Sequence, residues 1–144
     1  EHKLEFLFPR RSNCFAFNLT NAYKKQVGLM LEYKEYSNFE IIAAIAESRD
    51  TFPIIMDKRN GNRILSINFN IRNYGAEFVN SSVEQFAESI LFYNAFNEAQ
   101  KENYNKGLPE YECITEDIVG DLFEKMKGID QEAAKYGNFW NSKW

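Results

Sequence analysis

The sequence predicts an α+β domain in which an antiparallel meander sheet is packed by C-terminal helices. Two observations lead to this class. Before residue 72 several stretches alternate apolar and polar residues, and after residue 79 apolar residues recur at helical spacing. Strands that come first, with helices after them, are typical of α+β architecture. The chain has 144 residues, the usual size of one domain, so we expect 1–144 to fold as a single unit.

The first third of the chain predicts short strands. Residues 4–8 are mostly apolar and end at Pro9, and Phe15 and Phe17 alternate with small or polar neighbours, as in a half-buried strand. From residue 28 onward the period of two becomes clearer. It predicts a strand with one apolar face, formed by Leu29, Leu31 and Tyr33.

The centre of the chain completes the predicted meander, over residues 28–72. Residues 41–46 are continuously apolar, which indicates a central strand covered on both faces, although a buried helix remains an alternative. Residues 51–57 predict the next strand, with Pro53 near its start, where a missing hydrogen-bond donor is tolerated. Asn60-Gly61 then supplies a tight hairpin turn. A half-exposed strand, with its other face in water, is expected from Leu65, Ile67, Phe69 and Ile71.

A long helix is predicted after Val79. Ser81 with Glu84, and Ser82 with Gln85, form two overlapping capping-box patterns. The expected inward stripe consists of Val83, Phe86, Ala87 and Ile90. Further apolar residues then go round the helix and predict cover on more than one side; they are Leu91, Phe92, Tyr93 and Phe96. We expect this helix to end near Glu102.

A second helix is predicted from Thr115, which would cap it, to Gly128, which would stop it. Glu116 and Asp117 suit the positive end of its dipole. Its apolar face is expected to contain Ile118, Val119, Leu122, Phe123 and Met126. Asp130 resembles the cap of a further short helix through Tyr136. A last helical turn is expected to align Trp140 and Trp144.

The net charge indicates which classes of partner the protein could bind, and the cysteines indicate its cellular compartment. A net charge of −4 argues against nucleic acid and against an anionic membrane surface. Acidity favours a basic protein partner, although solubility alone also explains it. The apolar runs are shorter than the roughly 18 residues of a membrane span, and we find no signal peptide. Cys14 and Cys113 are therefore expected as free, buried thiols in a cytoplasmic protein.

The reactive side chains are few. The sole histidine is His2, near the N-terminus. Serine, cysteine and histidine-metal catalysis therefore each lack the usual base or ligand. The 7 glycines match no phosphate-binding loop. The 21 acidic residues leave a carboxylate-only hydrolase open, but a solvated face explains them better. We therefore expect no enzyme, with no catalytic residue, cofactor or metal site, and a function in protein binding.

Three stretches of the chain resemble one known family. Residues 78–86 read FVNSSVEQF, residues 128–133 read GIDQEA, and residues 139–140 read FW. Together with a strand pair around a glycine turn, they are similar in order to the fourth subfamily of the SUKH superfamily. That superfamily includes bacterial immunity proteins against polymorphic toxins and a yeast regulator of cell-wall synthesis. The resemblance covers residues 28–144, and residues 1–27 match it poorly.

The resemblance implies a non-enzymatic domain that binds and neutralises a toxin, often a nuclease or deaminase, inside the producing bacterium. An intracellular scaffold or regulator of the same fold is the alternative. The family's partners are diverse and its binding surfaces have no fixed residues, so the resemblance assigns no partner-binding residue. In this interpretation residues 80–82 are structural caps.

Overall fold

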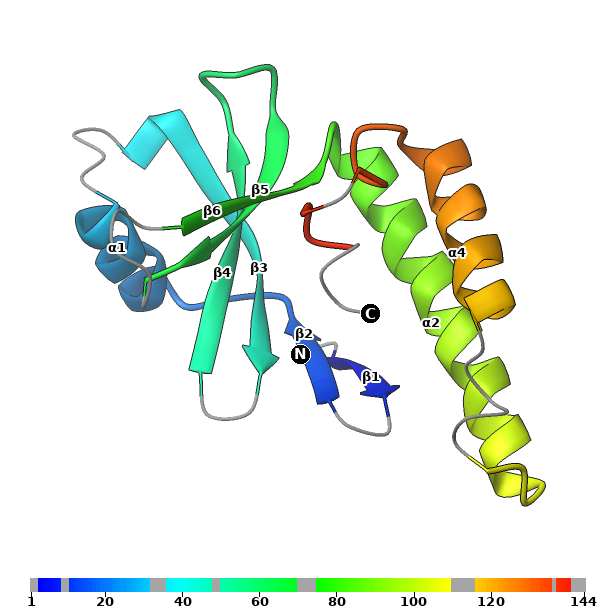
Figure 1. The fold of residues 1–144 in the computed structure, drawn as a ribbon. Coiled ribbons are helices and arrows are strands. Elements are labelled where there is room, and N and C mark those ends of the chain that lie inside the picture. The colour runs from blue at the N-terminus through cyan, green and yellow to red at the C-terminus, as the bar shows by residue number, and fades with distance from the viewer. Residues whose placement is uncertain are drawn as a thin grey trace.

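The computed structural model describes residues 3–8, 11–31, 36–47, 50–69, 75–109, 116–135 and 137–140. Within them the chain forms one six-stranded antiparallel sheet whose strand order follows the sequence, together with three α-helices and a 3-10 turn, η1 (Tyr36–Asn38) (Figure 1). The α+β class is confirmed. The strands are β1 (Lys3–Phe8), β2 (Arg11–Ala16), β3 (Phe39–Glu47), β4 (Asp50–Asp57), β5 (Arg63–Asn68) and β6 (Gly75–Asn80).

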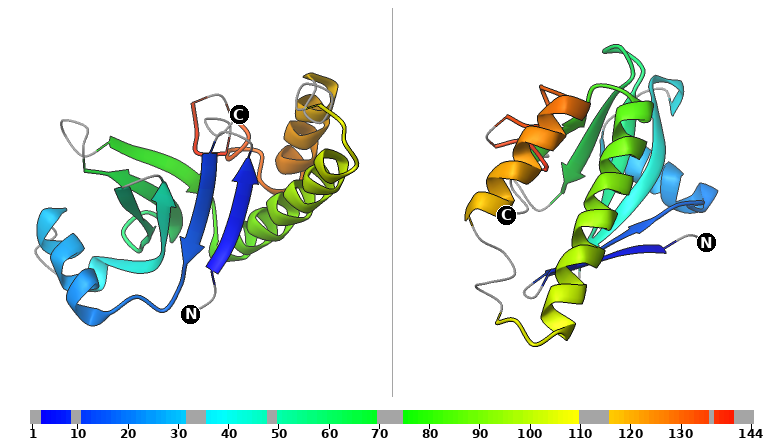
Figure 2. Two further views of the ribbon diagram at one scale, coloured as in Figure 1. Left: turned by 90° about the horizontal axis from the view of Figure 1, so that it is seen from below. Right: turned by 90° about the vertical axis from the view of Figure 1, so that its right-hand side faces the viewer.

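The sheet has helices on both faces. Helix α1 (Asn21–Met30) lies on one side, and α2 (Val83–Asn105) and α4 (Glu116–Ile129) lie on the other (Figure 2). Two apolar clusters result. The one towards α2 includes Ala43, Ile54 and Ile64, whereas the one towards α1 includes Ile41 and Ile55. A register shift between Ile41 and Ala43 adds one residue to β3.

The prediction of a strand from residue 28 is wrong, because residues 28–30 close helix α1. Thr20 is its N-cap and accepts a hydrogen bond from the backbone N–H of Tyr23 at 3.2 Å. Tyr23, Val27 and Leu31, spaced by four, pack on the apolar cluster of the sheet. Leu29, expected to face the core, has 66% of its surface exposed. The alternation of leucines after residue 28 therefore does not mark a strand. The spacing of Tyr23, Val27 and Leu31 is helical, and it agrees with the structure.

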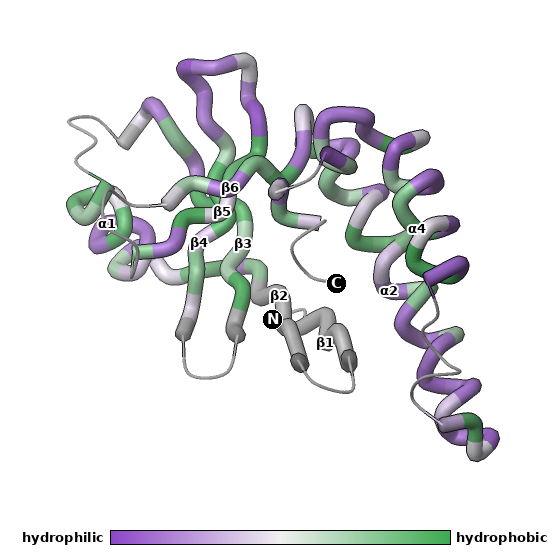
Figure 3. Tube along the Cα trace, in the orientation of Figure 1, coloured by the Kyte–Doolittle hydropathy of each residue, from purple (hydrophilic) through white to green (hydrophobic). Residues whose placement is uncertain are grey.

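The central strands are less exposed than the sequence predicts. Residues 41–46 form a strand, as expected, and the rival helix is excluded. In β5, however, Ile64, Leu65, Ser66 and Ile67 are all buried, so neither face of this strand is wet. The reason is tertiary: α1 covers one face and α2 the other. Figure 3 shows β3 and β4 as largely hydrophobic, in contrast to the polar hairpin that follows them.

The β4–β5 hairpin lies where Asn60-Gly61 places it. Positive φ occurs at Gly61 (68°) and Asn62 (60°), one position later than a two-residue turn on Asn60-Gly61 would require. The connection is longer because residues 58–62 wrap around Asp57. The backbone carbonyl of Asp57 accepts from the N–H groups of Asn60 and Asn62.

Both C-terminal helices are present, with shifted details. Ser82 caps α2 and accepts from the N–H of Gln85, so only one of the two capping patterns is used. The helix continues to Asn105, and α4 continues through Gly128. Residues 131–134 form turns instead of a helix. Several predictions fall outside the described residues, namely those on His2, Tyr33, Ile71, Cys113, Thr115, Tyr136 and Trp144, and on the side chain of Cys14.

Candidate functional site

A buried polar cluster joins the start of α2 to the end of α4. Asn80, at the end of β6, has no exposed surface. Its amide nitrogen donates to Ser89 Oγ at 3.0 Å and to Asp130 Oδ2 at 3.2 Å, and its amide oxygen accepts from Trp140 Nε1 at 2.9 Å. All the polar atoms of this side chain are therefore partnered, as burial requires.

Asp130 is the acceptor at the centre of the same cluster. Its carboxylate accepts from the backbone N–H of Ser81 at 2.6 Å and from Ser81 Oγ at 3.0 Å. It also caps the following turn, where it accepts from the N–H groups of Glu132 and Ala133 at 3.2 and 3.4 Å. The sequence predicted Asp130 as the cap of a short helix; the structure shows it capping a turn instead. The same carboxylate also fixes the β6–α2 junction, which local sequence did not indicate.

The buried cluster unites the three stretches on which the family resemblance rests. Asn80 and Ser81 come from the first stretch, Asp130 from the second and Trp140 from the third. Trp140 is also packed edge-on against Phe139, whose N–H donates to the carbonyl of Phe78. These residues hold elements together. Asn80, Asp130 and Trp140 are buried, and the hydroxyl of the exposed Ser81 is engaged by Asp130, so the cluster offers little free surface for binding. A functional surface must lie elsewhere.

The outer face of α2 is the first such surface. Five apolar residues occupy every fourth position and are all exposed: Val83, Ala87, Leu91, Ala95 and Ala99. We call this row the α2 ridge. Leu91, at its centre, has 67% of its surface exposed. The sequence had assigned Val83 and Ala87 to the core. Phe86 and Ile90 are inward, as expected, and the other buried positions are Ser89, Tyr93 and Asn97. Leu91, which was expected to be covered, is not.

The exposed charges on α2, around the ridge, are mostly negative. Glu84, Glu88, Glu98 and Glu102 are exposed on the same helix, and Lys101 is the one exposed cation among the residues of α2. Helix α4 borders the opposite flank, where Lys125 lies over the ring of Phe92 at 5.9 Å. The outer face of α2 is thus an apolar row in an acidic field. The sequence contains a signal for it, since glutamates follow Val83 and Ala87 directly.

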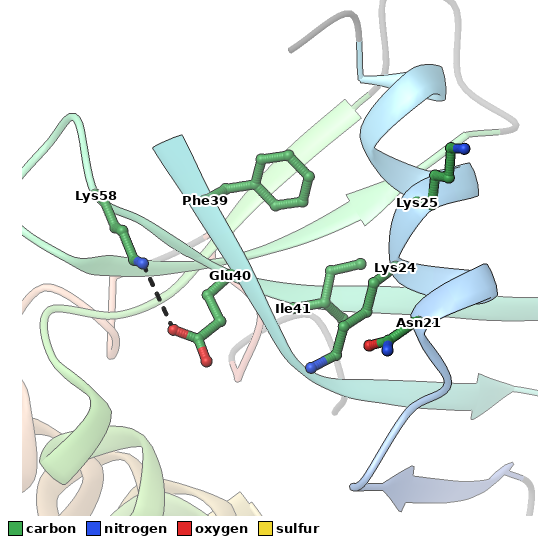
Figure 4. A pocket seen from close by; sticks show the side chains of 7 residues that line it. All are labelled: Asn21, Lys24, Lys25, Phe39, Glu40, Ile41 and Lys58. Carbon is green, nitrogen blue, oxygen red and sulfur yellow. Dashed lines mark ion pairs between the residues drawn. The ribbon is translucent and has the colours of Figure 1, made fainter. Parts of the chain in front are cut away.

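A basic hollow lies across the sheet from α2, at the start of α1 (Figure 4). Its volume is about 530 Å³, and it is lined by Asn21, Lys24, Lys25, Phe39, Glu40, Ile41 and Lys58. Phe39 and Ile41 point towards α1, while Glu40 points towards Lys58. The ammonium of Lys58 and the carboxylate of Glu40 are 3.7 Å apart, and both side chains are about half exposed. Three lysines against one glutamate make this hollow cationic.

Two carboxylates are buried among the described residues, Asp57 and Asp130. Burial raises the pKa of Asp57, but hydrogen bonds from Asn60 and Arg59 and the charge of Arg59 outweigh it, and the pKa is lowered overall. Each carboxylate is engaged by its own donors, on different elements. They form no facing pair of the kind a carboxylate-dependent hydrolase needs.

The part of the chain that the structure describes contains neither a candidate metal site nor a helix that could span a membrane. No three His, Cys, Asp or Glu side chains there are grouped so that they could hold a metal ion. The helices described are each too short or too polar to cross a membrane. Comparisons of the chain with family models, with curated proteins and with solved structures found no match.

Proposed function

We propose that this chain is a protein-binding domain that acts through the α2 ridge and its glutamates. Its partner is a basic protein. In line with the family resemblance, we propose that the domain is an immunity protein of the SUKH type, without enzymatic activity, which neutralises a nuclease or deaminase toxin in the cytoplasm of the producing bacterium.

The observation that carries the proposal is the exposure of Leu91 in the middle of an apolar row. Single exposed apolar residues are ordinary, but five at a spacing of four form a continuous ridge along one helix. A ridge of this kind fits into a groove of a partner, where its apolar surface leaves water. The surrounding glutamates add specificity, because they favour cationic partners and repel acidic ones.

The charge of the proposed partner fits its proposed identity. Enzymes that act on nucleic acid carry basic surfaces to bind phosphates. Such a surface is complementary to the glutamates of α2. An acidic protein that covers it would compete with the nucleic acid for the same cations, which is a direct route to neutralisation.

Binding and protection measured with a matched pair of variants test the proposal. The protein encoded by the neighbouring gene is expressed, its affinity for this chain is measured by calorimetry, and growth protection is scored in cells. Leu91→Arg should weaken binding by at least about tenfold, because it places a cation at the centre of the ridge. Leu29→Arg is the control, because Leu29 is equally exposed at 66% but lies on α1, across the sheet.

The outcomes separate the parts of the proposal. Equal binding by the two arginine variants, with thermal melts that match the wild type, would place the interface away from α2. Tight binding without growth protection would contradict the immunity role and favour the scaffold alternative. Turnover of a small substrate by the pure chain would contradict the non-enzymatic reading.

A further inference from the structure

The glutamates of helix α2 occupy regular positions relative to the α2 ridge. In the first half of the helix, Glu84 and Glu88 each directly follow a residue of the ridge. In the second half, Glu98 and Glu102 each directly precede a position of the same spacing of four. Successive residues of an α-helix lie about 100° apart around its axis. The two pairs of glutamates are therefore on opposite flanks of the ridge, one pair towards each end.

This arrangement leaves an uncharged lane across the outer face of α2. A row of spacing four is inclined to the helix axis by about 26°, so the ridge crosses the exposed face diagonally. One pair of glutamates borders each half of this diagonal, and all four side chains are exposed. Among the residues that the structure describes, no cation forms an ion pair with these carboxylates. They are available to a partner on both sides of the lane.

The lane has the geometry against which another helix packs. Rows of spacing four on two helices interdigitate when the helix axes cross at about 50°. A helix in this orientation lies along the ridge and covers neither pair of glutamates. Ala87, Ala95 and Ala99 contribute one methyl group each, so the two backbones can approach closely on either side of Leu91. An apolar helix surface of this kind is read through anchors at a spacing of three and four residues.

We infer that the partner contacts α2 through a basic amphipathic helix, which crosses it at about 50° and carries cations on both flanks, one group towards each end. This inference rests on the function proposed above and specifies the shape of the partner at the same site. Two facing helices are seen from opposite sides, so the order of charges is reversed between them. The cations of the partner helix precede its apolar row in the first half and follow the row in the second half.

Charge separates this occupant from the alternatives. Exposed ion pairs are individually weak and are screened by salt, so the apolar row supplies most of the affinity and the charges fix the orientation. A second copy of this chain would bring four more glutamates to the contact, where they would repel the first four. An acidic helix of another protein is disfavoured for the same reason.

Two stapled helical peptides of identical composition test the inference. Each has a row of leucine and alanine at a spacing of four, together with four lysines. In the matched peptide the lysines precede the row in the first half and follow it in the second. In the mirrored peptide this order is exchanged. Fluorescence anisotropy at low ionic strength should show that the matched peptide binds at least about tenfold more tightly than the mirrored one.

Variants of the protein assign the effect to the two flanks. The double variant Glu88→Lys with Glu98→Lys reverses one charge on each flank and should weaken binding of the matched peptide by at least about tenfold. Glu124→Lys is the matched control, because Glu124 is exposed on α4 on the side opposite the buried Leu122. It should leave peptide binding unchanged. Leu91→Arg should abolish the binding of both peptides, while thermal melts match those of the wild type.

The outcomes distinguish this inference from the proposed function. Equal affinity for the two peptides would refute the arrangement of charges, and absence of saturable binding at millimolar concentration would refute a helical partner. If that absence accompanies binding of the neighbouring gene's protein that is lost in Leu91→Arg, the proposed function stands and the helix inference falls. A dimer of the chain alone that is lost in the same variant, measured by sedimentation, would identify a second copy as the occupant and overturn the inference.

Discussion

The indole N–H of Trp140 donates a hydrogen bond to the side-chain oxygen of Asn80, which lies 60 positions earlier in the chain. Both side chains are buried, and Trp140 also contacts the ring of Tyr93 on α2 at 5.2 Å between centroids. The bond connects the end of the sheet to the C-terminal turn, and the contacts of Trp140 with Tyr93 and of Asn80 with Ser89 connect both to the long helix. It explains why an asparagine is required where a strand meets a helix.

The first prediction concerns the amide of Asn80. Asn80→Asp keeps the shape but replaces the donor to Asp130 by a second buried carboxylate. We expect it to lower the free energy of unfolding by about 3 kcal/mol or more at neutral pH, because two like charges face each other without water. Urea unfolding measures this. Asn18→Asp, at an exposed position, is the control and should change stability by less than about 0.5 kcal/mol.

The second prediction separates Ser81 from Ser82. Ser82→Ala removes the α2 cap and should cost about 1 kcal/mol. Ser81→Ala removes a hydroxyl that donates to Asp130, at a cost of about 1–3 kcal/mol. A double-mutant cycle with Asp130→Ala should show coupling above about 0.5 kcal/mol for Ser81 and near-additivity for Ser82. Equal coupling for both serines would contradict the assignment of their roles.

The third prediction concerns the pH dependence contributed by Asp57. Its folded pKa lies below the ordinary aspartate value of 3.8, because Asn60 and Arg59 hold the charged form despite burial. The contribution of this group to stability is therefore complete above that ordinary value and is lost as the pH falls through the folded pKa. Asp57→Asn should destabilise the protein at neutral pH, and the difference from wild type should shrink on acidification below pH 3.8. Urea titrations at several pH values measure the difference, and a constant gap would contradict the prediction.

The fourth prediction uses the same substitution at two glycines. Gly61 has φ of 68°, so Gly61→Ala should cost about 1 kcal/mol in backbone strain, although the added methyl group meets nothing. Gly120 lies inside α4 with open space around it, so Gly120→Ala should raise the free energy of unfolding by about 0.5–1 kcal/mol. Thermal melts of the two variants should shift in opposite directions. A shift in the same direction would contradict the backbone argument.

The sequence was sufficient for the elements whose signals are local. The strand pair around Asn60-Gly61, the start of α2 at Ser82 and the apolar face of α4 all follow from short-range pattern and are present. The sequence-based prediction was wrong at residues 28–31. The alternating leucines there indicated a strand, whereas the helical spacing of Tyr23, Val27 and Leu31 agrees with the observed helix α1. It also failed at β5, since burial of both faces depends on helices from distant parts of the chain.

The surfaces were harder to predict than the fold. The α2 ridge was missed because helix α2 carries two apolar rows, and only packing decides which one is inward. The hollow was missed because it is formed by α1, β3 and Lys58, with α1 interpreted as a strand. The Asn80–Asp130–Trp140 contacts join residues 50 and 60 positions apart, and no periodicity reports such distances.

Strand order equal to chain order has a consequence for biosynthesis. Each strand of this sheet can pair with its predecessor as soon as it emerges from the ribosome, since every pairing is with the adjacent strand. The bond from Trp140 to Asn80 must wait until a further 60 residues have been made. A nascent chain cut short before that tryptophan would possess all the strands and helices that the structure describes, yet its Asn80 oxygen would lack the indole donor. The stability of the sheet–helix junction therefore depends on a tryptophan that is made after the strands and helices that it holds together.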